Sequence, residues 1–145
     1  MATDPDCIFC KIIAGELPST RIDEDERTVA FMDINPATDG HVLVVPRAHS
    51  VDLHSIGVED LAACCAMAQR VASLQAEHLG ADGINLLNSA GAAAWQTVFH
   101  FHVHVIPRYQ DDPARDPLTL PWVPAPGDPA RIAATAEVLR GGDPV

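Results

Sequence analysis

The chain has few basic residues, with 9 Lys and Arg against 20 Asp and Glu and a formal net charge of −11. Nucleic-acid binding draws on clustered Lys and Arg, so this balance argues against an RNA or DNA partner. A small anionic ligand stays open, because backbone N–H groups and imidazoles can hold one inside a pocket. Long apolar runs are also missing. No stretch approaches the ~18 apolar residues of a membrane span, so we expect no membrane partner.

Cysteine is scarce as well, with four residues in a chain of 145. The N-terminal sequence lacks the basic and apolar regions of a signal peptide, so we expect a cytoplasmic protein. Its cysteines are then thiols or metal ligands rather than a disulfide framework. Cys64 and Cys65 lie in a predicted helix and are interpreted as core residues. With 48% hydrophobic residues at this length, the chain predicts a single compact domain.

Three histidines alternate with apolar residues in the run His100-Phe101-His102-Val103-His104-Val105-Ile106. Successive side chains of a strand point to opposite faces. The run therefore predicts a strand with three imidazoles on one face and the intervening apolar residues, starting from Phe99, on the other. A single strand histidine is usually structural. Three in register favour a metal site or a catalytic row, because imidazole serves as nucleophile, proton shuttle or metal ligand near neutral pH.

The other elements predict an α+β domain built on an antiparallel sheet of about five strands. A short N-terminal helix ends near Gly15, and one long helix is predicted over 58–79. Strand composition occurs at 28–32, 41–45 and 83–88, in addition to the histidine strand. We expect the domain to span residues 1–108. The Pro-rich extension 109–145 is predicted to pack on the same domain and to contain a final helix over 128–140, with Asp128 as its N-cap.

Cys7 and Cys10 form a Cys-x-x-Cys pair, which alone is weak evidence because a short helix can bury two thiols or use them in redox chemistry. Zinc needs two further ligands. His49, at the end of a predicted strand, and His100 could complete a Cys₂His₂ tetrahedron. The spacing departs from that of zinc fingers, so the fold would have to bring these four residues together.

The remaining histidines and the loop before the histidine run carry weaker signals. His41, His54 and His78 are interpreted as surface or capping residues and receive no role. The loop 88–97 is rich in small residues and leads into the histidine run, so its N–H groups could approach an anion. Taken alone, the loop is better explained as an ordinary connection.

The histidine run, Gln96-Thr97-Val98 before it and the segments 31–34 and 40–46 together resemble the histidine triad (HIT) family over most of residues 7–108. The resemblance implies a HIT-like α+β fold, usually a homodimer, and a purine nucleotide as substrate. It makes His102 the nucleophile at the α-phosphate, flanked by His100 and His104. It also implies a structural zinc ion, Zn²⁺, at Cys7, Cys10, His49 and His100. Positions of the nucleotide site are matched by Ile8, Phe9, Phe31, Asp33, Ile34, Asn88, Gln96, Thr97, Val98, His102 and His104.

Two branches of the family fit different parts of the chain. The Cys-x-x-Cys segment resembles Hint-like nucleoside phosphoramidases, whereas Gln96-Thr97-Val98 and the end of the histidine run resemble dinucleoside polyphosphate hydrolases. Trp95 stands where both branches commonly have Gly, on the leaving-group side. We expect a phosphoramidase that works through a nucleotidyl-histidine intermediate, with Thr97 as a candidate to protonate the leaving group. A polyphosphate hydrolase is the alternative within the family. A nucleotide sensor or scaffold without turnover is the alternative of another class.

Overall fold

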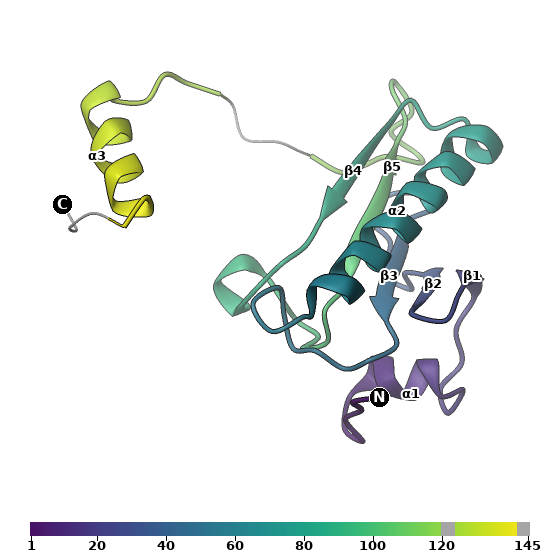
Figure 1. Ribbon diagram of the computed structural model, residues 1–145. Helices are drawn as coiled ribbons and strands as arrows, with labels where there is room; N and C mark the ends of the chain where they lie inside the picture. Colours follow the sequence, from purple (N-terminus) through teal and green to yellow (C-terminus); the bar gives the residue numbers. More distant parts are fainter. Residues whose placement is uncertain (120–123, 142–145) are drawn as a thin grey trace.

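The computed structural model describes residues 1–119 and 124–141. It shows one antiparallel sheet with the strand order β1-β2-β3-β5-β4 (Figure 1). The strands are β1 (Arg21–Glu24), β2 (Thr28–Met32), β3 (Val42–Pro46), β4 (Gly83–Leu87) and β5 (Val103–Arg108). The β2–β3 hairpin pairs Thr28 with Pro46 and Met32 with Val42, as the turn residues between them predict. With one long helix and a short N-terminal helix, this architecture confirms the predicted fold class.

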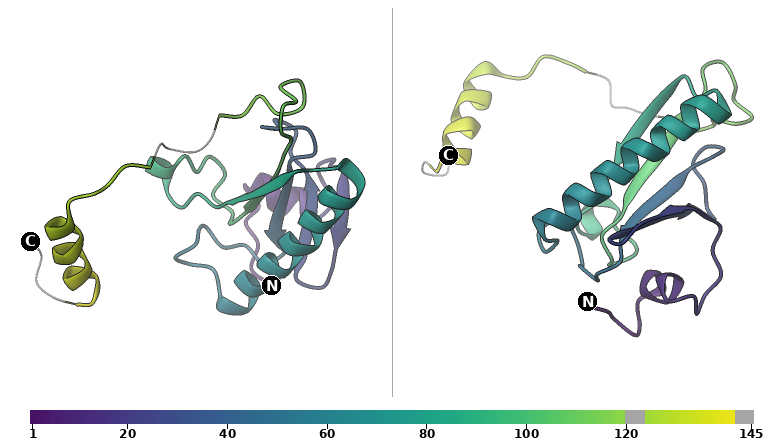
Figure 2. Two further views of the ribbon diagram at one scale, coloured as in Figure 1. Left: turned by 90° about the horizontal axis from the view of Figure 1, so that it is seen from above. Right: turned by 45° about the vertical axis from the view of Figure 1, so that its right-hand side comes forward.

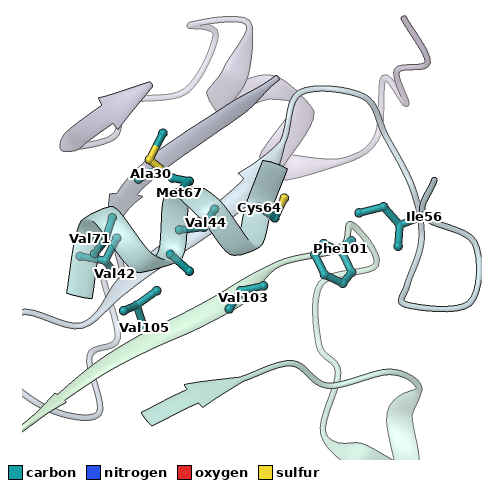
Figure 3. Packing of buried hydrophobic residues seen from close by; sticks show 11 residues of the cluster. Ala30, Val42, Val44, Ile56, Cys64, Met67, Val71, Phe101, Val103 and Val105 are labelled. Carbon is teal, nitrogen blue, oxygen red and sulfur yellow. The ribbon is translucent and has the colours of Figure 1, made fainter. Parts of the chain in front are cut away.

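The long helix α2 (Val58–Leu79) lies along one face of the sheet (Figures 1 and 2). Figure 3 shows the apolar side chains between the two layers. Met67 and Val71 of the helix and Val44 and Val105 of the sheet are almost completely buried there. Burial of such side chains is the main source of stability of a domain of this kind.

The two cysteines of α2 differ in their surroundings. Cys64 is fully buried, whereas Cys65 is exposed. Neighbouring residues of a helix are turned by about 100° from one another, so only one of the two faces the sheet. The interpretation of Cys65 as a core residue was therefore wrong.

The opposite face of the sheet carries the short helix α1 (Ile8–Ile13), whose N-cap is Cys7. Phe9 of this helix packs edge-on against Phe31, with ring centroids 5.5 Å apart. Val29, Leu43 and Val45 complete this second, smaller apolar cluster. Since α1 covers only part of the face, it leaves room for a cavity beside the histidines.

The histidine strand is shorter than predicted, because β5 begins only at Val103. Before it, the Phe101 N–H donates to the Ser50 carbonyl at 2.7 Å, and the His100 ring bonds the Pro46 carbonyl at 2.8 Å. These contacts hold residues 100–101 beside the segment that follows β3, in an irregular conformation without the regular hydrogen bonds between paired strands. Phe101 is still buried against α2, but Phe99 is half exposed and, contrary to the prediction, does not fill the apolar face together with Phe101.

The C-terminal extension has two parts in the described residues. The first packs on the domain, where the Tyr109 hydroxyl donates to the Asp39 carbonyl at 2.6 Å and Arg108 pairs with Asp116 at 2.8 Å. The second is α3 (Pro129–Leu139), capped by Asp128, which stands apart from the sheet in Figures 1 and 2 and has no buried residue. The division at residue 108 and the packing of the whole extension stay predictions. None of the described helices is both long enough and apolar enough to span a membrane.

Candidate active site

A cavity of about 280 Å³ lies between α1, the β2 end of the sheet and the histidine run. Apolar side chains form one part of it, and the carboxylate of Asp33 and two imidazoles form another. The structure brings nine of the predicted nucleotide-site residues to its wall: Ile8, Phe9, Phe31, Asp33, Ile34, Thr97, Val98, His102 and His104. Such a mixture of apolar surface and few converging polar groups is typical of a small-molecule site.

The ring of His102 is held in one orientation and one tautomer. Its Nδ1 lies 2.7 Å from the His100 carbonyl, which can only accept, so Nδ1 carries the proton. Phe9 packs edge-on against the ring, with centroids 5.2 Å apart. Burial lowers the pKa of His102 from its ordinary value, although the His100 carbonyl and Asp33 oppose this shift. The result is a neutral imidazole whose Nε2 lone pair has no hydrogen-bond donor among the described residues, which is the state a nucleophile needs.

His104 is oriented by His41, a residue that received no role in the sequence analysis. The Ala37 N–H donates to His41 Nδ1 at 3.0 Å, so the proton of His41 is on Nε2. This Nε2–H donates to His104 Nδ1 at 2.9 Å, which leaves the proton of a neutral His104 on its own Nε2. Burial, with smaller contributions from His102 and His41, lowers the pKa of His104 to about 4. Near neutral pH, His104 is therefore a neutral hydrogen-bond donor through Nε2.

His41 was wrongly interpreted as a surface or capping residue, since it is 3% exposed. Its position beside the histidine run follows from the sheet register, in which Leu43 pairs with His104. His41 lies two residues before Leu43 and thus on the same face. This two-residue spacing from Leu43 is the sequence signal for the role of His41. It can be interpreted only when the pairing of β3 with β5 is known. His54 and His78 lie away from the cavity.

Four predicted zinc ligands converge behind the histidine run. His100 Nδ1 lies 3.4 Å from Cys7 Sγ and 3.6 Å from Cys10 Sγ, and His49 Nδ1 lies 3.5 Å from Cys10 Sγ. The two Nδ1 atoms are 3.2 Å apart. Tetrahedral zinc, with Zn–S bonds of about 2.3 Å and Zn–N bonds of about 2.0–2.1 Å, separates S and N ligands by about 3.6 Å and two N ligands by about 3.3 Å. The spacing of the four donors thus fits zinc.

The surroundings of the four donors fit a metal as well. His100 Nε2–H donates to the Pro46 carbonyl, so its Nδ1 lone pair faces the cysteines, as a metal-bound imidazole requires. Backbone N–H groups of Cys10 and Asp4 donate to the sulfur atoms of Cys7 and Cys10, at 3.4 and 3.5 Å. These donors favour negative charge on sulfur. His100 therefore has two tasks: its ring belongs to the metal cluster and its carbonyl holds His102.

Asn88 and Gln96 support the site without lining the cavity. The Asn88 amide donates to the His102 carbonyl at 2.9 Å. The Gln96 side chain accepts from the Gly91 N–H at 2.8 Å and donates to the Val51 carbonyl at 2.7 Å. Both residues fix backbone on either side of the histidines. Their predicted contact with a phosphate stays a prediction.

Comparisons with known proteins identify the family. The HIT domain family matches residues 14–111, more than half of the chain, and the protein belongs to this family. A curated relative named adenylylsulfatase, from Arabidopsis thaliana, is 39% identical over 107 residues, covering 74% of this chain and 54% of the relative.

Two solved structures extend this result. SMU.412c from Streptococcus mutans superposes with a TM-score of 0.88 at 36% identity, covering 97% of this chain and 87% of that one. A Zn-bound histidine triad family protein from Mycobacterium smegmatis superposes with a TM-score of 0.72 at 46% identity, covering 74% and 78% of the two chains. The second carries zinc in a fold that this chain shares.

Proposed function

We propose that the protein hydrolyses a nucleoside 5′-phosphate derivative, a nucleoside phosphoramidate, through a covalent intermediate on His102. The observation that carries the proposal is the fixed tautomer pair: a free lone pair on His102 Nε2 beside a proton donor on His104 Nε2. The apolar wall around Phe31 and Ile34 suits a nucleobase, and Asp33 suits the ribose hydroxyls. The adenylylsulfatase named among its relatives also supports a hydrolase of nucleotide derivatives.

In the first step, His102 Nε2 attacks the α-phosphorus, a P–N(His102) bond forms and the bond to the leaving amine breaks. The Nδ1–H that donates to the His100 carbonyl steadies the positive charge on the ring. The amine must gain a proton as it leaves, and Thr97 at the cavity wall is the candidate to deliver it. In the second step, water attacks the same phosphorus, the bond to His102 breaks and the nucleoside monophosphate leaves.

His104 stabilises charge on the phosphoryl oxygens rather than attacking. Its Nε2–H donates to the oxygen on which negative charge develops, which is most effective in a site that excludes water. The cluster of Cys7, Cys10, His49 and His100 would hold zinc. Bound there, zinc would supply structural support, because none of these four residues lines the nucleotide cavity.

His41→Phe is expected to lower kcat/KM about 100-fold, because His104 loses the donor that fixes its tautomer. His41→Gln, which can still donate, is expected to recover part of the loss. The ¹⁵N shifts of the His104 ring, measured by NMR, should move from a single tautomer to a mixture in the Phe variant alone. An unchanged tautomer with the same loss of activity would contradict the role given to His41.

The direct test is hydrolysis of adenosine phosphoramidate and of diadenosine polyphosphates, side by side, by the wild type and a His102 variant. Faster phosphoramidate hydrolysis supports the proposal, whereas faster polyphosphate hydrolysis selects the alternative. Nucleotide binding with no turnover and no histidine adduct would indicate a sensor.

We also propose a homodimer that forms through the β4 edge of the sheet. Among the described strands, β4 pairs only with β5, and its Leu86 is 56% exposed. A groove lined by Cys65, Ala72 and Ile84 continues the apolar surface onto α2.

Leu86→Lys is expected to shift the protein from dimer to monomer in sedimentation experiments, because a buried unpaired charge is costly. Arg70→Lys is the control, because Arg70 pairs with Asp23 and Asp25 near β1, at the edge of the sheet opposite β4. A variant with the wild-type mass distribution would contradict this interface.

A further inference from the structure

A second cavity lies between α2 and the first three strands, on the face of the sheet opposite the nucleotide cavity. Its volume is about 340 Å³, compared with about 280 Å³ for the nucleotide cavity. The wall is mainly apolar and takes side chains from four elements: Ile22, Met32, Val42, Val71, Leu74 and Leu79. A cavity of this size that combines an apolar wall with few polar groups is typical of a small-molecule site.

The buried polar side chain of this cavity is that of Gln75, on α2, which is only 2% exposed. Its Nε2 donates to the Gly40 carbonyl at 2.9 Å and to the Val105 carbonyl at 3.0 Å. Both partners can only accept, so the amide orientation is fixed and Oε1 cannot exchange places with Nε2. Oε1 receives no hydrogen bond from any described residue. A buried acceptor without a donor is unfavourable, so the wall lacks a donor that a bound molecule could supply.

The charges around the cavity restrict the kind of molecule that fits. Asp39 and His78 line it at exposed positions, and the His78 ring lies 4.0 Å from the Glu77 carboxylate. The described wall contains no Lys or Arg. An anionic group would therefore meet carboxylates without a fixed cation, and any charge placed against the apolar wall would lose its hydration. An uncharged molecule suits the cavity best.

We propose that this cavity is a second ligand site, which binds an uncharged, mainly apolar small molecule whose N–H or O–H group donates to Gln75 Oε1. The site goes beyond the proposed hydrolysis and does not depend on it. Among the described lining residues, the two cavities share only Met32, at the end of β2. The apolar wall supplies the affinity, and the single acceptor selects molecules that carry a donor.

The test compares indole with benzofuran, two bicyclic molecules of nearly the same shape, of which only indole has an N–H donor. NMR titration of the full chain with ¹³C-labelled methyl groups gives the Kd at each location. The methyl groups of Ile22, Val71 and Leu74 report on this cavity, and those of Ile8 and Ile34 report separately on the nucleotide cavity. At this cavity, indole is expected to bind about fivefold more tightly than benzofuran, the effect of one net hydrogen bond. Transfer from water alone would favour benzofuran, which is the less polar of the two.

Two variants of the same kind control the location. Leu74→Trp places a larger side chain in the cavity wall and should remove the binding of both probes there. Leu53→Trp makes the same change at a half-exposed position outside the cavity and should bind both probes as the wild type does. Gln75→Leu should remove the preference for indole.

The wild type alone decides the proposal if a variant does not fold. Equal affinities for the two probes, or tighter binding of benzofuran, would overturn the donor contact with Gln75. Saturable shifts confined to Ile8 and Ile34, or no saturable shift at all, would overturn the site. Unchanged binding in a folded Leu74→Trp variant would overturn it as well.

Discussion

His102→Ala is expected to lower the rate of phosphoramidate hydrolysis by at least ~10⁴-fold, since removal of a nucleophile that acts within a preorganised group has effects of this size or larger. The residual site would keep Asp33, the apolar wall and the His104 donor, so nucleotide affinity should change little. The loss therefore appears in kcat rather than in binding. Mass spectrometry of the wild type after rapid quenching should show one nucleotidyl group on His102, and the variant should show none.

The matched control for this prediction is His54→Ala, which removes an exposed imidazole far from the cavity. It should retain wild-type rates. A His102 variant that hydrolyses the substrate at the wild-type rate would exclude the covalent route. An adduct on His104 instead would mean that the two rings exchange the roles assigned to them by their hydrogen bonds.

Removal of zinc is expected to lower both the Tm and kcat. A metal present at 1,000 times its Kd stabilises the folded state by about 4 kcal/mol, which corresponds to a Tm decrease on the order of 10 °C upon removal. Activity should fall with it, because His100 belongs to the cluster through its ring and holds His102 Nδ1–H through its carbonyl. The measurement is metal content, Tm and kcat before and after treatment with a chelator, followed by readdition of zinc.

Cys10→Ser should reproduce the effect of the chelator, whereas Cys65→Ser is the control because that thiol is exposed and outside the cluster. Purified protein with no zinc, a Tm that the chelator does not change and full activity of Cys10→Ser would together contradict the metal site. A decrease in Tm without any loss of kcat would keep the zinc but separate it from the orientation of His102.

The parts of the fold with local, periodic signals were predicted well from the sequence. The helix over 58–79 and the helix capped by Asp128 follow from apolar spacing and N-cap chemistry, which act within a few residues. The start of β5 at Val103 was missed, because it depends on hydrogen bonds from distant carbonyls of Pro46 and Ser50. The alternation of apolar and polar residues cannot show where tertiary hydrogen bonds replace the hydrogen bonds between paired strands.

The candidate site shows the same division. The histidine run and the Cys-x-x-Cys pair were visible as motifs, and the fold brings them to the expected surroundings. The role of His41 was not visible, since it depends on the Ala37 N–H and on the register between β3 and β5. The left-handed backbone of Trp95, with a φ of 72°, was equally hidden, because a residue type does not reveal its φ.

The alternation along β5 has a consequence for how this protein can change. Val103 and Val105 face α2 and carry the core, while His104 between them faces the cavity. Residues that stabilise the fold and residues that act in the site therefore alternate along one short strand. The first contact α2, and the second face the cavity on the opposite side of the sheet. Substitutions at exposed cavity residues of other segments, such as Ile34, are expected to change the cavity without disturbing the packing under α2. Single substitutions can thus change the substrate selectivity while most of the folding free energy is kept.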